Sequence, residues 1–400
     1  MQNISYFCIV KHLKKDFCTF LGIILMILPL KVMAQDSIQA NAMDSVEVSL
    51  LTCSPHEEIY SLYGHTALRW HDLREHKDMA FNWGVFNFQK PYFVLRFVFG
   101  LTDYELGVIP MNYFMQEYQS VGSSVTEQVL NLTTEEKQRL FMALLKNYEP
   151  ENRIYRYNYF YDNCSTRPRD IIEQCINGKI EYAEREDFTP SYREMVGVCT
   201  RNHPWATFGN DMLLGVKADM ATDRRQQEFL PEHLLYDFDR AQIYANGEYR
   251  PLVKERRTIV PPGVQVIEPD FIFSPTECAA ALLILSIVII AFEWKRKKTL
   301  RLWDSLLMVA QGLVGLLLFV MLFSQHPTTS TNLQILLFNP LPFAFLPAVI
   351  RGRSTRWWLL LAVMFVLYMI GSLFQHYAEG MIIVALCLLL RSMIHFKLKA

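Results

Sequence analysis

The segment YRYNYFYDNCSTRP, residues 155–168, changes its periodicity at one cysteine. Before Cys164, tyrosine occupies every second position, and this period of two predicts a strand over residues 155–161. After it, Ser165 or Thr166 can cap a helix whose first turn tolerates Pro168. We therefore expect a strand that runs into Cys164 and a helix that begins just beyond it.

A cysteine at this junction has a chemical advantage. The unpaired N–H groups and the dipole of a helix N-terminus favour the thiolate, which is the nucleophilic form. The same N–H groups can stabilise an oxyanion on a substrate. Cys164 is therefore a candidate nucleophile, although a lone cysteine is more often a small buried apolar residue.

A histidine that could activate this thiol lies in the segment YGHTALR, residues 63–69. Gly64 allows a close backbone approach beside His65. Alternating apolar residues predict three strands in this part of the chain, over residues 46–51, 62–70 and 80–88. His65 therefore lies on a strand, where it can act as a general base, although a single histidine beside a glycine is usually structural.

An asparagine on the neighbouring strand can orient the imidazole. Asn82 can accept the second ring N–H of His65 and so fix its tautomer, and Asn87 is the second choice. We predict Cys164, His65 and Asn82 as the catalytic residues. A histidine on a strand, followed by a cysteine at a strand-to-helix junction, is the order of a circularly permuted papain-like fold. The predicted class is therefore α+β with an antiparallel sheet.

Composition places this domain in a membrane protein. Of the 400 residues, 51% are hydrophobic, and the mean hydropathy is +0.11. The net charge of −1 gives no attraction to nucleic acid, so we expect none to bind. In residues 1–34, three lysines precede an apolar stretch, which is followed by Lys31 and a small-residue end at Ala34, and this order is typical of a cleaved signal peptide. An uncleaved signal anchor is the alternative. Either a signal peptide or a signal anchor would export the part of the chain that follows it.

The remaining chain divides in two. Residues 35–275 contain no apolar run long enough to span a bilayer, and they end in a proline-rich linker. Residues 276–400 contain about five apolar segments, at residues 279–292, 306–323, 333–350, 357–374 and 381–393. Basic residues follow the first, third and fifth segments. By the positive-inside rule, residues 35–275 lie in the periplasm and the chain crosses the inner membrane several times.

Polar residues on the periplasmic side of these segments are candidates for substrate binding, because such groups are costly near lipid. They are His326, Asn332, Asn339 and His376. His326 and His376 could instead mark loop ends in water. Asp304, near the opposite end, is expected to order helix packing. No spacing typical of a metal site or a phosphate-binding loop occurs, so we expect no cofactor.

Oxidising conditions outside the cytoplasm make the cysteines informative. Cys175 and Cys199 could form a disulfide, although spacing alone does not establish one. A disulfide at Cys164 would exclude its role as nucleophile.

The chain resembles the Lnb-type lipoprotein N-acyltransferases. The resemblance rests on residues 63–69, on Asn82-Trp83-Gly84 and on residues 159–166. It continues through Trp205, Gly209 and Phe229-Leu230-Pro231, and it reaches the membrane part at His326-Pro327 and Asn339-Pro340.

This resemblance implies a transfer reaction between lipids. An acyl chain would pass from a membrane phospholipid, through a thioester on Cys164, to the α-amine of a diacylated lipoprotein. Cys164 would be the nucleophile and His65 its base, whereas Asn82 rests on the local argument.

Two other functions fit the same residues. A membrane-tethered cysteine amidase or peptidase acting on cell-wall peptides would use the same pair with water in place of the amine. A non-enzymatic exported receptor or assembly factor would not need the pair.

Overall fold

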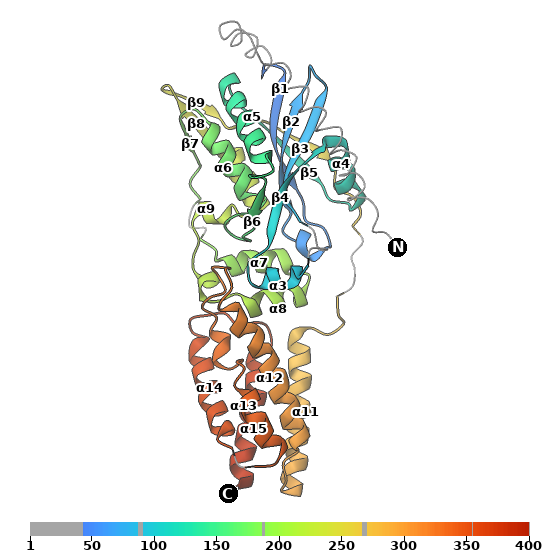
Figure 1. The fold of residues 1–400 in the computed structure, drawn as a ribbon, viewed down its shortest axis with the longest axis vertical. Coiled ribbons are helices and arrows are strands. Elements are labelled where there is room, and N and C mark those ends of the chain that lie inside the picture. The colour runs from blue at the N-terminus through green and yellow to red at the C-terminus, as the bar shows by residue number, and fades with distance from the viewer. Residues whose placement is uncertain (1–42, 87–90, 186–188, 266–269, 354, 400) are drawn as a thin grey trace.

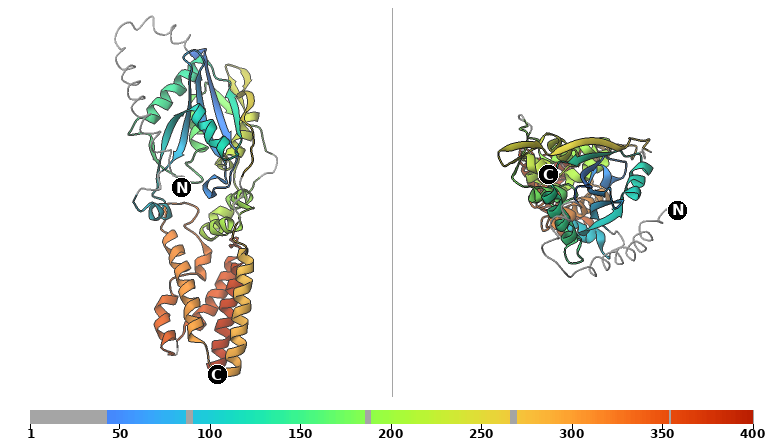
Figure 2. Two further views of the ribbon diagram at one scale, coloured as in Figure 1. Left: turned by 90° about the vertical axis from the view of Figure 1, so that its right-hand side faces the viewer. Right: turned by 90° about the horizontal axis from the view of Figure 1, so that it is seen from above.

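The computed structural model describes residues 43–86, 91–185, 189–265, 270–353 and 355–399. The expected signal peptide at residues 1–34 and the second-choice Asn87 lie outside these ranges. Figures 1 and 2 show a β-sheet domain and a bundle of helices stacked end to end along the long axis of the molecule.

Among the described residues, seven antiparallel strands form the main sheet, in the order β10-β5-β1-β2-β3-β4-β6. The strands are β1 (Val46–Cys53), β2 (His65–Asp72), β3 (Lys77–Val85), β4 (Asp103–Pro110), β5 (Val125–Leu130), β6 (Ile154–Arg156) and β10 (Val253–Val260). The antiparallel sheet and the surrounding helices confirm the α+β class, and the three expected upstream strands are present with ends shifted by a few residues.

Both faces of the sheet are covered, because apolar residues occupy consecutive positions in the central strands. Leu50 packs in the core under α5 (Thr134–Tyr148), α6 (Thr166–Cys175) and α10 (Pro231–Arg240). Leu51, on the opposite side of β1, packs in the core under α4 (Met111–Ser120). A period of two thus supplies each side with its own set of buried side chains.

The remaining elements of this domain lie beside the sheet or between it and the bundle (Figure 1). A small sheet has the order β7-β8-β9. The bounds are η1 (Ile59–Ser61), α3 (Phe93–Val98), β7 (Lys179–Glu181), α7 (Tyr192–Thr200), α8 (Pro204–Leu213), η2 (Val216–Asp219), α9 (Arg224–Gln227), β8 (Gln242–Ala245) and β9 (Glu248–Pro251).

The strand expected over residues 155–161 is wrong beyond its first residues. β6 ends at Arg156, and Asn158 and Asp162 then pair with each other through two backbone hydrogen bonds of 3.0 Å. The Asn158 side chain accepts hydrogen bonds from the N–H groups of Phe160 and Tyr161. An asparagine that bonds the backbone ahead of it favours a turn, and here it overrides the alternating pattern.

The bundle contains α11 (Pro275–Arg296), α12 (Arg301–Met321), η3 (Leu333–Leu336), α13 (Pro342–Ile350), α14 (Trp357–Gly371) and α15 (Met381–Lys399). Within the described ranges, three helices are long and apolar enough to cross a membrane: α11, α12 and α15, with mean hydropathies of 2.2, 2.0 and 2.0. Helix α14 is apolar but has only 15 residues. The structure therefore shows a helical membrane region with three candidate spans.

The segment expected to span as residues 333–350 is interrupted. It consists of η3 and α13, separated by a turn at Asn339. Pro340 and Pro342 have no N–H to donate, so a continuous helix is broken there. Asn339 stabilises the turn, since its amide donates to the Ile335 oxygen and its carbonyl oxygen accepts from Leu341 N–H.

The sheet domain is fixed to two loops at the adjacent end of the bundle. These loops are residues 322–332 and 372–380, and we call them the domain-side loops. Gly215 N–H donates to the Thr328 oxygen and Val216 N–H to the Thr331 oxygen, both at 2.8 Å. A Cβ at Gly215 would lie 2.2 Å from the Thr331 oxygen, so only glycine allows this close approach.

Candidate active site

Residues from three parts of the sheet domain meet near its membrane end. His65 is the first residue of β2 and pairs with Cys53, the last residue of β1. Asn82 lies on the adjacent strand β3, and Cys164 directly precedes Ser165, the N-cap of α6. In Figure 1, β1 begins at the end of the sheet far from the bundle and runs toward the helices, so its pairing partner His65 lies at the near end.

The histidine is held between the other two residues. Its Nε2 lies 2.6 Å from the Asn82 side-chain oxygen, which can only accept, so Nε2 carries a hydrogen. The ring is also hydrogen-bonded to Cys164, and Nδ1 is the nitrogen left for the sulfur. Asn82 is buried, whereas His65 and Cys164 are partly exposed and can be reached by a substrate.

This pair perturbs its own acid–base equilibria. Burial raises the pKa of Cys164, but the charge of His65 and hydrogen bonds from His65, Thr66 N–H and Ser165 outweigh burial, so the pKa is lowered. Burial lowers the pKa of His65, but Cys164 and Asn82 outweigh it, so that pKa is raised. Both shifts favour a thiolate beside an imidazolium, which is an activated cysteine.

Asn163 shapes the turn that presents the sulfur. Its buried amide donates to the oxygens of Tyr159 and Phe229, both at 2.9 Å. Its side-chain oxygen accepts from Ser165 N–H at 2.8 Å and from Thr166 N–H at 3.0 Å. Ser165 occupies the N-cap without a side-chain capping bond, so the expected cap by Ser165 or Thr166 is wrong and Asn163 performs it instead.

The same bonds correct the expectation that this helix end stabilises an oxyanion. Ser165 and Thr166 N–H donate to Asn163, Arg167 N–H donates to the Asn163 oxygen, and Pro168 has none. These donors are already engaged within the protein.

Thr66 and Ser165 are site residues that sequence reasoning missed. Thr66 N–H and the Ser165 hydroxyl both bond the sulfur of Cys164. Their hydroxyl oxygens lie 3.0 Å apart and are buried, so Thr66 can donate to Ser165 while Ser165 donates to the thiolate. The sequence signal for them was their position, because Thr66 directly follows His65 and Ser165 directly follows Cys164.

Two glycines beside these residues adopt backbone conformations with positive φ. Gly64 has φ +73°, and a Cβ there would lie 2.8 Å from the Cys53 oxygen, so the expected close approach beside His65 is present. Gly84 has φ +102°, and a Cβ there would lie 3.8 Å from both Cys164 Cβ and His65 Cε1. Each backbone conformation favours glycine.

The four polar residues of the membrane part are not gathered at this pair. Asn332 is buried, and its amide donates to the Met212 oxygen at 2.7 Å, so it fixes α8 to a domain-side loop. Asn339 stabilises the turn before α13, as described above. His326 Nε2 lies 2.9 Å from the Phe97 oxygen. His376 is exposed and lies near enough to Asp211 to help lower the pKa of that carboxyl against the larger effect of burial.

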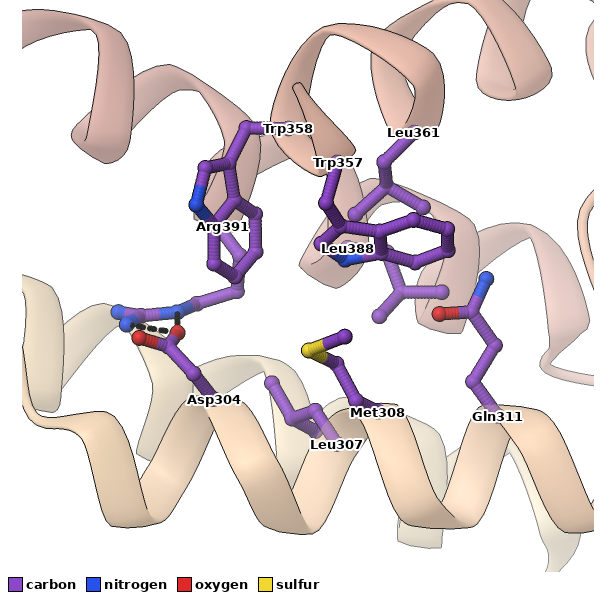
Figure 3. Close-up of a pocket in the computed structure, with 9 residues that line it drawn as sticks. All are labelled: Asp304, Leu307, Met308, Gln311, Trp357, Trp358, Leu361, Leu388 and Arg391. Carbon is purple, nitrogen blue, oxygen red and sulfur yellow. Dashed lines mark hydrogen bonds and ion pairs between the residues drawn. The ribbon is translucent and has the colours of Figure 1, made fainter. Parts of the chain in front are cut away.

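A small cavity lies elsewhere, among α12, α14 and α15 (Figure 3). On one side, Asp304 and Arg391 form an ion pair of 2.5 Å, and Arg391 also binds Glu293. Asp304 further contacts His395 at 3.0 Å. These buried charges join α11, α12 and α15, in agreement with the packing role expected for Asp304.

The cysteines of the sheet domain are separate thiols. Cys175 packs in the core under α5 and α6. Cys199 packs against a separate cluster that contains Phe160, Tyr192 and Phe229. The possible disulfide between them is therefore absent from the described residues, and Cys164 is also a free thiol.

Comparisons with known proteins agree with this organisation. A family model described as the Lnb N-terminal periplasmic domain matches residues 34–197, and one described as the Lnb transmembrane domain matches residues 267–400. No curated protein and no solved structure matches the chain. His65, Asn82 and Cys164 all lie within the first matched region. The chain therefore belongs to the Lnb family and is a membrane protein with a periplasmic N-terminal domain.

Proposed function

We propose that this protein is a lipoprotein N-acyltransferase. It moves an acyl chain from a membrane phospholipid, through a thioester on Cys164, to the α-amine of a diacylglyceryl-cysteine lipoprotein. The observation that carries this proposal is the Cys164–His65 pair, activated by Asn82 and placed at the end of the sheet nearest the membrane helices. Membership of the Lnb family supports the same chemistry.

The first step transfers the acyl group to sulfur. His65 takes the thiol proton, and the Cys164 thiolate attacks an ester carbonyl of the phospholipid. The tetrahedral intermediate collapses, the ester C–O bond breaks, and the lysophospholipid alkoxide leaves with the proton from His65. The sulfur then holds the acyl chain as a thioester.

The second step transfers the acyl group to nitrogen. The free α-amine, whose ordinary pKa is about 8, attacks the thioester carbonyl and gives its proton to His65. The C–S bond breaks, Cys164 leaves as the thiolate, and an amide forms. Because an amide is more stable than a thioester, this step runs forward.

The proposal includes a membrane arrangement. The bundle lies in the inner membrane as a multi-pass region of about five crossings, in which η3, α13 and α14 accompany the three long helices. The basic residues at 295–298 and 351–356 face the cytoplasm. The sheet domain has a circularly permuted papain-like arrangement, supported by His65 on a strand and Cys164 before a helix. Of the four polar candidates, His376 is the exposed one, and we assign it to contact with the lipoprotein.

The direct test is mass spectrometry of the intact protein after incubation with phospholipid vesicles. We expect one acyl adduct, located on the peptide that contains Cys164, which disappears when a diacylated lipopeptide with a free amine is added. Cys164→Ala should form no adduct. Cys199→Ala removes another free thiol of the same domain and is the matched control, which should acylate normally.

Two results would replace this proposal. Cleavage of cell-wall peptides without any acyl adduct would favour the membrane-tethered amidase or peptidase. Intact cellular function in Cys164→Ala and His65→Ala would favour a receptor or assembly factor that is not an enzyme.

A further inference from the structure

Helix α3 presents an apolar surface to its surroundings. Tyr92, Leu95, Phe97 and Phe99 are 77%, 56%, 43% and 38% exposed. Arg96, the one charged residue in this segment, turns back to the sheet domain, where it binds Asp103 of β4 at 2.7 Å. Large apolar side chains exposed together in this way mark a surface that contacts lipid or another apolar partner.

The position of α3 identifies lipid as that partner. The Gln325 N–H donates to the Phe99 oxygen at 3.0 Å, and His326 Nε2 lies 2.9 Å from the Phe97 oxygen. Both residues belong to the domain-side loop that follows α12, a candidate membrane span ending at Met321. Helix α3 is therefore bound to the chain just beyond the end of α12 that faces the sheet domain (Figure 1).

A second exposed apolar segment lies at the same end of the bundle as α3. Phe271, Ile272 and Phe273 are 62%, 88% and 54% exposed and directly precede α11, another candidate span. Trp205 of α8 donates its indole N–H to the Phe273 oxygen at 2.8 Å. Aromatic residues at the ends of spans are typical of the membrane–water boundary.

A series of aromatic rings leads from α3 toward the sulfur. Phe93 lies 5.9 Å from Phe86, Phe86 lies 4.9 Å from Tyr104, and Tyr104 lies 4.1 Å from Tyr157, as ring centroids. Burial, and after it the charge of Cys164, raises the pKa of Tyr104 to about 12 and raises that of Tyr157. The last two rings thus lie within electrostatic range of Cys164.

We propose that α3 lies in the membrane leaflet next to the sheet domain, and that the rings of Phe93, Phe86 and Tyr104 guide the acyl chain of the donor lipid from there to Cys164. The second part rests on the proposed function, whereas the first part does not. A chain held along these rings stays in apolar surroundings while its ester carbonyl reaches the thiolate.

Photo-crosslinking of the full chain tests the position of α3. The photoreactive residue p-benzoylphenylalanine replaces Leu95 in one variant and Leu73, which is 49% exposed in the turn between β2 and β3, in the control. Both are irradiated in vesicles of phosphatidylethanolamine and phosphatidylglycerol. We expect lipid adducts by intact mass at position 95 and none at position 73. Equal yields at the two positions would overturn the proposal, whatever the enzymatic activity.

Acylation rates test the path. In Phe86→Ala, we expect the ratio of Cys164 acylation by p-nitrophenyl dodecanoate to that by p-nitrophenyl acetate to fall about tenfold, because contacts to the long chain are lost. The thermal unfolding midpoint of the variant in detergent shows whether it is folded, and the ratio of the two rates corrects for any general change at the site. An unchanged ratio would overturn the path. If neither ester acylates the wild-type protein, the proposed function itself fails, and the crosslinking result still decides where α3 lies.

Discussion

The side-chain amide of Asn332 donates a hydrogen bond of 2.7 Å to the main-chain oxygen of Met212, and this bond joins a domain-side loop to α8. The Asn332 side-chain oxygen accepts from Gln375, which in turn donates to the Leu214 oxygen. Helix α8 also contacts the segment before β2, because Asn210 donates to the hydroxyl of Tyr63 at 2.9 Å, and Tyr63 lies two residues before His65. The membrane region thus fixes α8, and through α8 the segment that precedes His65 at the start of β2.

Removal of the Asn332 side chain should loosen this attachment. In Asn332→Leu, the Met212 oxygen and the Gln375 amide each lose one hydrogen bond, while the Met212 oxygen keeps Gln334 and Gln375 keeps the Leu214 oxygen. We expect a cost of about 0.5–1.5 kcal/mol for each bond lost. We expect faster hydrogen exchange at the amides of Gly215 and Val216, which bond the domain-side loop. Ser330→Ala, at an exposed position of the same loop, is the control and should leave exchange unchanged. Wild-type protection in Asn332→Leu would show that the attachment does not depend on this amide.

The pH dependence of alkylation should identify Cys164 among the thiols. Its lowered pKa keeps it ionised at a pH where an ordinary thiol is protonated, so its reaction with iodoacetamide should begin at lower pH. Burial raises the pKa of Cys53 and of Cys175, and raises that of Cys199 to about 11, so these thiols should react only at higher pH or not at all. Peptide mass spectrometry after labelling at a series of pH values measures each one.

His65→Ala tests whether the imidazole is the cause of this lowered pKa. The variant removes the positive charge that lowers the pKa of Cys164 and leaves the burial that raises it. The alkylation profile of Cys164 should therefore move to higher pH, while that of Cys199 stays in place. Coincident profiles for wild type and His65→Ala would mean that the imidazole does not activate the sulfur.

Loss of the Asn82 carboxamide should slow acylation without preventing it. Asn82→Ala removes the acceptor that holds Nε2–H, so the ring can rotate away from the sulfur, and a misplacement of this kind costs about a hundredfold in rate. Asn147→Ala is a matched control, because Asn147 bonds the indole N–H of the neighbouring residue Trp83 and does not contact the histidine. The measurement is the rate of acyl adduct formation on Cys164, and equal rates in the two variants would exclude an orienting role for Asn82.

Local sequence patterns correctly predicted strands whose formation depends mainly on residues close together in the chain. The period of two gave β1, β2 and β3, and the asparagine chosen for its strand position does bond His65. The pattern failed over residues 157–161 because Asn158 forms a turn with the backbone just ahead of it. The span predicted from apolar length over residues 333–350 was wrong because prolines interrupt a segment whose composition alone suits a span.

Long-range partners explain what the sequence could not show. Asn332 was a candidate for substrate binding, but its partner Met212 is 120 residues away and Gln375 is 43 residues away. A polar residue near lipid is unusual whether it binds a substrate or another part of the chain, so its presence alone does not separate the two roles.

The buried charges at the other end of the bundle should dominate its stability. Arg391 binds both Glu293 and Asp304, and each of the three side chains is about 1% exposed or less. In Arg391→Met, Glu293 and Asp304 both lose the guanidinium, and Asp304 keeps its contact with His395. Removing one partner of a buried ion pair costs about 3–5 kcal/mol. Thermal unfolding in detergent should show a clear decrease in the midpoint, whereas Arg353→Met, at an exposed position, should not. Glu293 lies near the end of α11 and Asp304 near the start of α12, and these helix ends are far from the sheet domain (Figure 1). Alkylation of Cys164 in the folded variant should therefore keep its wild-type pH profile. A normal midpoint in Arg391→Met would mean that the carboxylates find other partners or become protonated.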